Sequence, residues 1–226
     1  MVKGLAKYIK KYGDIGMTAE KESKVNQQQE DNDTLEEFLK KYDDSKYEKP
    51  SVTADIIIFS KKDDNIKVLL IKRKSHPFKD SYALPGGFTN SGESLEESAR
   101  RELFEETSLE CDNLEQLRTF STPGRDPRRW VMTCAFMAIV DADECMVEAG
   151  DDAKEAEWFD IKMKPFYTDN RYELLLQYGD TKIRAIVEKT SEGVVSGKPE
   201  FKLLESENIA FDHGLILAYA MDALAR

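Results

Sequence analysis

The chain has 226 residues, with 33 basic and 44 acidic side chains and a net charge of −11. This length allows one sizeable catalytic domain, and the acidic balance argues against nonspecific binding to nucleic acid or to an anionic membrane surface. Three scattered cysteines indicate neither a disulfide framework nor a zinc motif, and no apolar run approaches a membrane span, so we expect a cytoplasmic protein without nucleic acid or membrane partners.

Residues 1–32 are predicted to form a polar, flexible N-terminal arm. Their second half is nearly devoid of large apolar residues, which is typical of a linker. Lysines between positions 7 and 11 interrupt any signal-like apolar core, and a short basic amphipathic helix is the alternative to a frayed arm. Structured chain is expected from residue 33, with Asp33 as the cap of a short helix.

The domain over residues 33–226 is predicted to contain many strands and few helices. A first hairpin pairs 51–60 with 66–74, and a turn at 82–88 leads into a helix. Apolar, β-branched and aromatic residues predict further strands at 114–121, 130–140 and 156–161, a second hairpin at 171–190 and a final helix at 211–226. The pattern indicates an α+β fold with a hairpin-like insertion near 171–205.

The central helix has a clear beginning. Ser94 followed three residues later by Glu97 forms a capping box, and a glycine-rich loop precedes it. Apolar residues recur at four-residue spacing and provide one face to bury, namely Leu95, Ala99 and Leu103. The segment is therefore predicted to be an amphipathic helix that follows a loop.

Three carboxylates share the adjoining face of this helix. Glu102, Glu105 and Glu106 are spaced i, i+3 and i+4, so at about 100° per residue they lie within one wedge and repel one another unless a positive group lies between them. A hard divalent cation such as Mg²⁺ suits such oxygen ligands. Glutamates on a surface helix are more often simply solvated, so the metal interpretation depends on the surrounding pattern.

That pattern spans residues 87–109. It has Gly87, then Glu93 after five residues, and then Arg101 and Glu102 after seven more, followed by an aliphatic residue and two further glutamates. This spacing resembles the Nudix box, Gx5Ex7REUxEExGU with U aliphatic. Every fixed position matches except the last glycine, which is Ser108 here. The chain is thereby identified as a member of the Nudix hydrolase superfamily.

The resemblance implies a fold and a chemistry. The fold is an α/β/α sandwich with a mixed sheet, and the chemistry is metal-dependent cleavage of a diphosphate. Magnesium or manganese ions would bind the carbonyl of Gly87 and the carboxylates of Glu102, Glu105 and Glu106, while a Glu93–Arg101 salt bridge would orient the loop against the helix. These four residues, Arg101, Glu102, Glu105 and Glu106, are the expected catalytic group.

One carboxylate is expected to take the proton of the attacking water. Glu105 and Glu106 are the candidates on the helix. Family members differ, however, in whether the helix or a distal loop supplies this base, and the loop alternatives here are Asp151, Asp152 and Glu155. A solvated acidic turn is the other interpretation of that loop.

Substrate contacts are predicted outside the helix. The segment FSTPGRDPRRW, residues 120–130, places arginines in a loop between two strands, where a guanidinium offers a bidentate fork to phosphate or carboxylate. The alternative is that Asp126 pairs with an arginine and stiffens the loop. The motif TPGRDPR, the lead-in KYEKPSVTADIIIF and the closing IAFDHGLILAYAMDAL are similar to the branch containing ADP-ribose pyrophosphatases and their relatives, the Nudix-related transcription regulators.

In this branch the substrate would be ADP-ribose, split into AMP and ribose 5-phosphate, or a similar nucleoside diphosphate linked to a sugar. The expected substrate-binding residues are Arg125, Phe88, Arg73 and Arg128. Either Tyr82 or Trp130 could stack on adenine, although rings at strand ends are more often core. His213 is interpreted as structural, and Asp212 as a helix cap.

The main alternative is a ligand sensor without catalysis. Regulator relatives often lose the acids of the box and carry a DNA-binding winged helix, whereas here the acids are intact and no basic recognition helix is found. Within the enzyme class, NAD(H), other nucleotide sugars, dinucleoside polyphosphates and oxidised nucleotides remain alternative substrates. Relatives of this branch are commonly homodimers, so a homodimer is expected.

Overall fold

The computed structural model describes residues 34–226 apart from 64, 142–144, 146, 148, 150–152 and 195. The chain divides into two compact units, the second running from Lys49 to Arg226. None of the helices in the described residues is long and apolar enough to span a membrane. The predicted arm, residues 1–32, lies outside the described part, as do Asp151 and Asp152.

The first unit contains the short helix α2 (Leu35–Lys41), which has no buried residues. Its cap is Thr34, whose hydroxyl accepts a hydrogen bond from the Glu37 N–H at 3.3 Å, while the Glu37 carboxylate accepts one from the Thr34 N–H at 2.9 Å. The prediction of Asp33 as the cap was therefore wrong by one position, and Asp33 itself is not among the described residues. A threonine hydroxyl caps a helix in the same way as an aspartate carboxylate.

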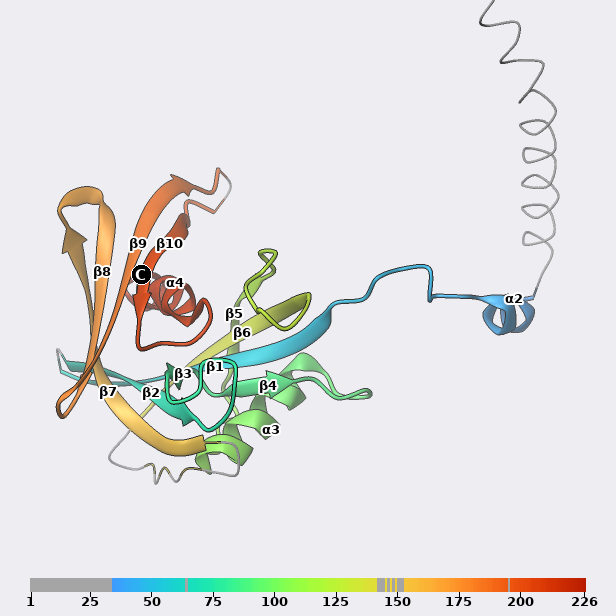
Figure 1. The fold of residues 1–226 in the computed structure, drawn as a ribbon, viewed down its shortest axis with the longest axis horizontal. Helices are drawn as coiled ribbons and strands as arrows, with labels where there is room; N and C mark the ends of the chain where they lie inside the picture. Colours follow the sequence, from blue (N-terminus) through green and yellow to red (C-terminus); the bar gives the residue numbers. More distant parts are fainter. Residues whose placement is uncertain are drawn as a thin grey trace, which may run out of the picture. The chain divides into compact units, whose positions relative to one another are not determined.

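The second unit is built on one mixed ten-stranded sheet (Figure 1). Its main path has the order β10-β9-β8-β7-β2-β1-β6-β5, with β3 added beside β2 and β4 beside β1. The strands are β1 (Ser51–Lys62), β2 (Asn65–Arg73), β3 (Tyr82–Ala83), β4 (Gly86–Phe88), β5 (Glu115–Phe120), β6 (Val131–Val140), β7 (Ala153–Phe166), β8 (Thr168–Tyr178), β9 (Thr181–Glu192) and β10 (Pro199–Glu207). The helices are α3 (Leu95–Thr107) and α4 (His213–Leu224).

Strand β1 lies inside the sheet, between β2 and β6, and is covered on both faces. Ile57 and Phe59 pack in the hydrophobic cluster that includes α4, whereas Ile56 and Ile58 pack in a separate cluster with α3. Because successive side chains of a strand point to opposite faces, the two helices lie on opposite sides of the sheet. The predicted α/β/α sandwich with a mixed sheet is confirmed.

The hairpins form where they were predicted. In the first, Lys62 of β1 pairs with Asn65 of β2, and in the second, Tyr178 of β8 pairs with Thr181 of β9 across a turn in which Gly179 has a φ of 55°. β7 is longer than predicted, and β10 was not predicted as a strand. Within the segment 171–205, the strands β8, β9 and β10 continue the central sheet and share a core with α4.

Candidate functional site

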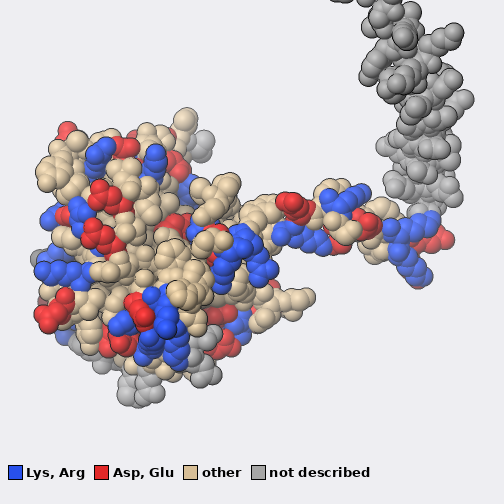
Figure 2. Space-filling view, viewed as in Figure 1, with Lys and Arg blue, Asp and Glu red and all other residues tan. Residues whose placement is uncertain are grey.

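A cleft of about 460 Å³ opens beside β1, β4 and α3. Most of the predicted site residues line it, namely Arg73, Gly87, Phe88, Arg101, Glu102, Glu106, Arg125 and Arg128. Figure 2 shows acidic and basic side chains interspersed over the visible face of this unit, with a dense group of basic ones over the segment between β2 and β3. Residues from distant parts of the chain thus meet at one hollow.

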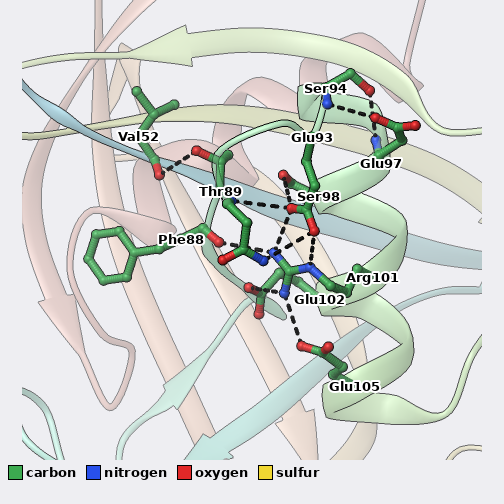
Figure 3. Close-up of polar contacts among 11 residues, drawn as sticks. Val52, Phe88, Thr89, Glu93, Ser94, Glu97, Ser98, Arg101, Glu102 and Glu105 are labelled. Atoms are coloured by element: carbon green, nitrogen blue, oxygen red, sulfur yellow. Dashed lines mark hydrogen bonds and ion pairs between the residues drawn. The ribbon is translucent and has the colours of Figure 1, made fainter.

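Helix α3 is fixed at its start by the predicted capping box (Figure 3). The Ser94 hydroxyl accepts a hydrogen bond from the Glu97 N–H at 3.2 Å, and the Glu97 carboxylate accepts one from the Ser94 N–H at 2.7 Å. Ala99 and Leu103 are fully buried in the cluster beneath the helix. One face of α3 is therefore anchored in the core and the neighbouring face turns toward the cleft.

Helix α3 ends at Thr107, and its C-cap is Ser108, the position where the family pattern has glycine. Ser108 adopts the left-handed conformation with a φ of 57°, and its N–H donates to the Phe104 carbonyl at 2.8 Å. The loop geometry expected of a glycine is thus present, but a residue with a side chain adopts it. This conformation strains a serine backbone, because Cβ approaches the following carbonyl.

We expect Ser108→Gly to raise the free energy of unfolding by about 0.5 kcal/mol. The left-handed conformation costs a serine roughly 1–2 kcal/mol, which exceeds the roughly 0.5–1 kcal/mol of extra backbone entropy that glycine loses on folding. Urea denaturation measures the difference. The matched control is Ser121→Gly at an exposed loop position without a positive φ, where the same change should only destabilise. Equal losses at both positions would contradict strain at Ser108.

Arg101 ties the glycine-rich loop to the middle of α3 (Figure 3). Its Nε donates to Glu93 Oε1 at 2.8 Å, and its Nη2 donates to Glu93 Oε2 at 3.0 Å and to the Phe88 carbonyl at 3.0 Å. The Arg101 guanidinium, together with Asn90 and Ser98, holds the pKa of Glu93 well below its usual range. The bidentate pair between Arg101 and Glu93 fixes the position of the loop, and the lowered pKa keeps Glu93 ionised.

The same guanidinium also lies between two acids of α3. Arg101 Nη1 donates to Glu102 Oε1 at 2.7 Å and to Glu105 Oε2 at 3.0 Å. Burial raises the pKa of Glu102, while Arg101 opposes that effect. The positive group expected between these carboxylates is therefore supplied, in this structure, by the protein itself.

The three acids differ in their surroundings. Glu106 is 8% exposed and its Oε2 accepts a hydrogen bond from the Gly86 N–H at 2.8 Å. The Glu105 side chain is 55% exposed and does not line the cleft, unlike Glu102 and Glu106. Among the described residues, no three His, Cys, Asp or Glu side chains converge as a preformed metal site.

The oxygen donors at this end of the cleft nevertheless suit a hard cation. A Cβ at Gly87 would come too close to a Glu102 carboxylate oxygen, so a larger residue there would push that carboxylate away from the backbone. Carboxylate and carbonyl oxygens are the ligands that Mg²⁺ and Mn²⁺ prefer. The donor chemistry therefore fits the divalent ion that the sequence pattern implies.

Arg125 is held at the floor of the cleft by two aspartates. Its Nε and Nη2 donate to Asp212 at 2.9 and 2.6 Å, and Nη2 lies 3.4 Å from Asp55 Oδ2. The Arg125 side chain is only 5% exposed. Burial alone would lower the pKa of Arg125, but Asp212 and Asp55 hold the pKa of Arg125 above its usual value. Burial also raises the pKa of the Asp55 carboxyl.

Asp212 precedes α4 as predicted, but its carboxylate makes no capping hydrogen bond. Asp212 is thus the N-cap residue of α4, as predicted, while its carboxylate is engaged by Arg125 instead of capping the helix. His213 is buried, and its Nδ1 accepts a hydrogen bond from the Leu84 N–H at 2.9 Å. Burial lowers the pKa of His213 to about 3, which keeps the ring neutral near pH 7 and agrees with a structural role.

The remaining arginines of the cleft have different partners. Arg128 forms a fork with Asp126, through Nε at 3.0 Å and Nη2 at 2.7 Å, so the alternative pairing weighed for this loop is present. Arg73 Nε donates to the Pro77 carbonyl at 2.9 Å, and no described carboxylate forms an ion pair with Arg73. Burial lowers the pKa of Arg73, and the neighbouring Arg128 lowers it further.

Other predicted candidates lie away from the cleft. Tyr82 is 5% exposed and its hydroxyl donates to Glu155 at 3.2 Å, while Lys72 pairs with the same carboxylate at 3.2 Å. Trp130 is 47% exposed and does not line the cleft. Neither ring predicted to stack on a base therefore faces this site, and Glu155 is already engaged by two neighbours.

Asp55 and Phe211 are among the cleft residues that the sequence analysis did not predict. Asp55 is a buried acid within the apolar run of β1, and this charge inside a core strand was the available signal. Phe211 lines the cleft just before α4, and no comparable signal marked it.

The chain is similar to known proteins in both sequence and structure. The family model described as the NUDIX domain matches residues 49–177. An ADP-ribose pyrophosphatase of Methanocaldococcus jannaschii is 43% identical over 144 residues, covering 62% of this chain and 82% of the relative. The ADPR responsive transcriptional repressor NtrR of Acinetobacter baylyi is 29% identical over 192 residues, covering 83% of this chain and 75% of the relative.

Solved structures give the same grouping. A MutT/nudix family protein from Enterococcus faecalis has a TM-score of 0.67 and 37% identity, with 85% of this chain and 70% of that chain covered. The NUDIX domain of Shewanella oneidensis NrtR, solved with ADP ribose, has a TM-score of 0.60 and 25% identity, with 85% and 99% covered.

Proposed function

Because this chain belongs to the NUDIX domain family, we propose that it is a metal-dependent pyrophosphohydrolase that splits ADP-ribose into AMP and ribose 5-phosphate. The observation that carries the proposal is the arrangement of one cleft, in which the acids Glu102 and Glu106 lie with the arginines Arg73 and Arg128. The similarity to an ADP-ribose pyrophosphatase over 82% of that protein supports the substrate.

The proposed chemistry follows from the charges in the cleft. Mg²⁺ or Mn²⁺ would be held by Glu102, Glu105, Glu106 and the Gly87 carbonyl. When bound, such an ion would neutralise the negative charge of the diphosphate and lower the pKa of a bound water. Arg101 orients Glu102 and, through the Phe88 carbonyl, joins it to the strand β4 that carries Gly87. Arg73 and Arg128 attract the negative substrate, whose own charge would otherwise be repelled by a chain of net charge −11.

Glu106 is the proposed general base. Of the two helix candidates it alone lines the cleft, whereas Glu105 is largely exposed and bound to Arg101. The hydrogen bond from the Gly86 N–H fixes the Glu106 carboxylate in place. A positioned carboxylate can accept the proton of the attacking water without rearrangement of the helix.

The proposed form of the protein is a cytoplasmic homodimer whose partner is a nucleoside diphosphate-linked small molecule, without nucleic acid or membrane partners. The net charge of −11 supports the absence of nucleic acid from its partners. Light scattering on the purified protein tests the assembly.

The second candidate function is ligand sensing without hydrolysis. It is supported by the relatives NtrR and NrtR, one named as an ADPR-responsive repressor and the other solved with ADP ribose. The complete set of box acids favours the enzyme, because a sensor needs to bind the ligand but not to cleave it.

Purified protein is expected to release AMP and ribose 5-phosphate from ADP-ribose with Mg²⁺ or Mn²⁺, and to release neither in EDTA. A panel with NADH, other nucleotide sugars, a dinucleoside polyphosphate and an oxidised nucleoside triphosphate should show slower turnover. Mass spectrometry of the products identifies the bond that is cleaved. Tight binding of ADP-ribose with no turnover at any metal concentration would favour the sensor instead.

A further inference from the structure

One wall of the cleft carries an alternating series of aromatic rings and guanidinium groups, formed by Phe88, Arg128, Phe211 and Arg73, which we call the arginine–phenylalanine ladder. The Cζ of Arg128 lies 5.1 Å from the ring centre of Phe88 and 5.7 Å from that of Phe211. The Cζ of Arg73 lies 5.0 Å from the same Phe211 ring. All four residues line the cleft.

The ladder is held from several directions. The carbonyl of Phe88 accepts a hydrogen bond from Arg101, while the Phe88 ring points away from α3 (Figure 3). Arg128 is fixed by its fork to Asp126, whose side chain is only 3% exposed. Its flat guanidinium is therefore oriented before any ligand arrives.

The ladder is also accessible and positively charged. The Arg128 side chain is 40% exposed, and Arg73 has no ion pair with a described carboxylate. Two neighbouring guanidinium groups repel each other, as the lowered pKa of Arg73 reflects after the larger effect of burial. An anionic ligand with a flat group would relieve this repulsion and cover the rings.

We propose that the nucleobase of the substrate packs against the arginine–phenylalanine ladder, on the wall that Phe211 and Arg128 provide. This inference rests on the proposed function, because it names the part of the cleft that recognises the nucleotide. Phenyl rings and guanidinium planes both stack on bases, and every base offers a flat face. Phe211, rather than Tyr82 or Trp130, is thus the ring that stacks on the base.

The test uses binding rather than turnover. AMP and ribose 5-phosphate are titrated into the full chain in EDTA by calorimetry, because the first probe has a base and the second has none. The variants are Phe211→Leu and Phe88→Leu, with Phe211→Tyr as the conservative change. Phe78→Leu is the matched control, since Phe78 touches Phe211 at a ring-centre distance of 4.8 Å but does not line the cleft.

Unchanged protein should bind AMP more tightly than ribose 5-phosphate. Phe211→Leu and Phe88→Leu should each weaken AMP binding about tenfold, as expected when a base loses an aromatic face, and should leave ribose 5-phosphate unchanged. Phe211→Tyr and Phe78→Leu should keep the AMP affinity.

The proposal would be overturned if the unchanged protein bound AMP and ribose 5-phosphate with equal affinity. It would also be overturned if Phe211→Leu and Phe78→Leu weakened AMP binding equally. Hydrolysis of ADP-ribose can fail while these binding differences persist, in which case only the proposed function is lost. Conversely, if the protein hydrolyses ADP-ribose normally but neither Phe211→Leu nor Phe88→Leu changes its affinity for AMP, only the proposed base site is wrong.

Discussion

Glu106→Gln is expected to reduce kcat for ADP-ribose by about 10³-fold, equivalent to about 4 kcal/mol of transition-state stabilisation. The substitution removes the negative charge and the proton acceptor from the cleft. It should not disturb the fold, because the glutamine carbonyl can still accept the hydrogen bond that Gly86 N–H donates to Glu106 at 2.8 Å. Steady-state kinetics at saturating metal and the thermal midpoint together measure both effects.

The matched control is Glu96→Gln on the same helix. Glu96 is exposed on the first turn of α3 and does not line the cleft, so its removal should leave kcat within about twofold. Glu105→Gln should fall between the two, because Glu105 is largely exposed and reaches the site through Arg101. If Glu106→Gln turned over normally, the proposed catalytic role of this helix face would be wrong.

Arg125→Ala is expected to lower the free energy of unfolding by about 3 kcal/mol, because it leaves buried carboxylates without their cation. The side chains of Asp212 and Asp55 are 14% and 9% exposed, and Arg125 binds both. The sequence alone predicted a substrate contact at Arg125. Its burial indicates that the loss of stability should instead dominate the phenotype.

Urea denaturation at pH 7 measures this loss, and Arg129→Ala is the matched control. Arg129 lies in the same loop, is exposed and forms no ion pair with a described carboxylate, so its removal should cost under about 0.5 kcal/mol. The deficit of Arg125→Ala should shrink as the pH falls, because burial raises the pKa of Asp55 and protonation removes its unpaired charge. A normal unfolding curve with a raised KM would restore Arg125 as a substrate contact.

The acid end of the cleft could be predicted from sequence because its geometry is local. Glu93, Arg101 and the glutamates of α3 lie within fourteen positions, and helix periodicity with a capping box places them relative to one another. Arg101 accordingly pairs with Glu93 as predicted. What periodicity did not show is that Arg101 also lies between Glu102 and Glu105.

The floor and the ladder could not be predicted, because their contacts join segments far apart in the chain. Arg125 meets Asp212 across 87 positions and Asp55 across 70. Phe211 reaches the cleft only because α4 packs on the sheet, and no local pattern of residues encodes that approach. The strand β10 was missed although its first half alternates apolar and polar residues as a half-buried strand does, because its last three residues are all polar and exposed.

The parallel pairing of β1 with β6 runs without interruption from Ser51 opposite Val131 to Ser60 opposite Val140. Gly87 pairs with Ala54 of the same strand, and the chain enters β6 directly after the loop that carries Arg128. A shift by one residue would move that loop by about 3.3 Å along β1. The distance between Gly87 and the loop that carries Arg128 therefore depends on the alignment of two backbones and not only on the loop itself.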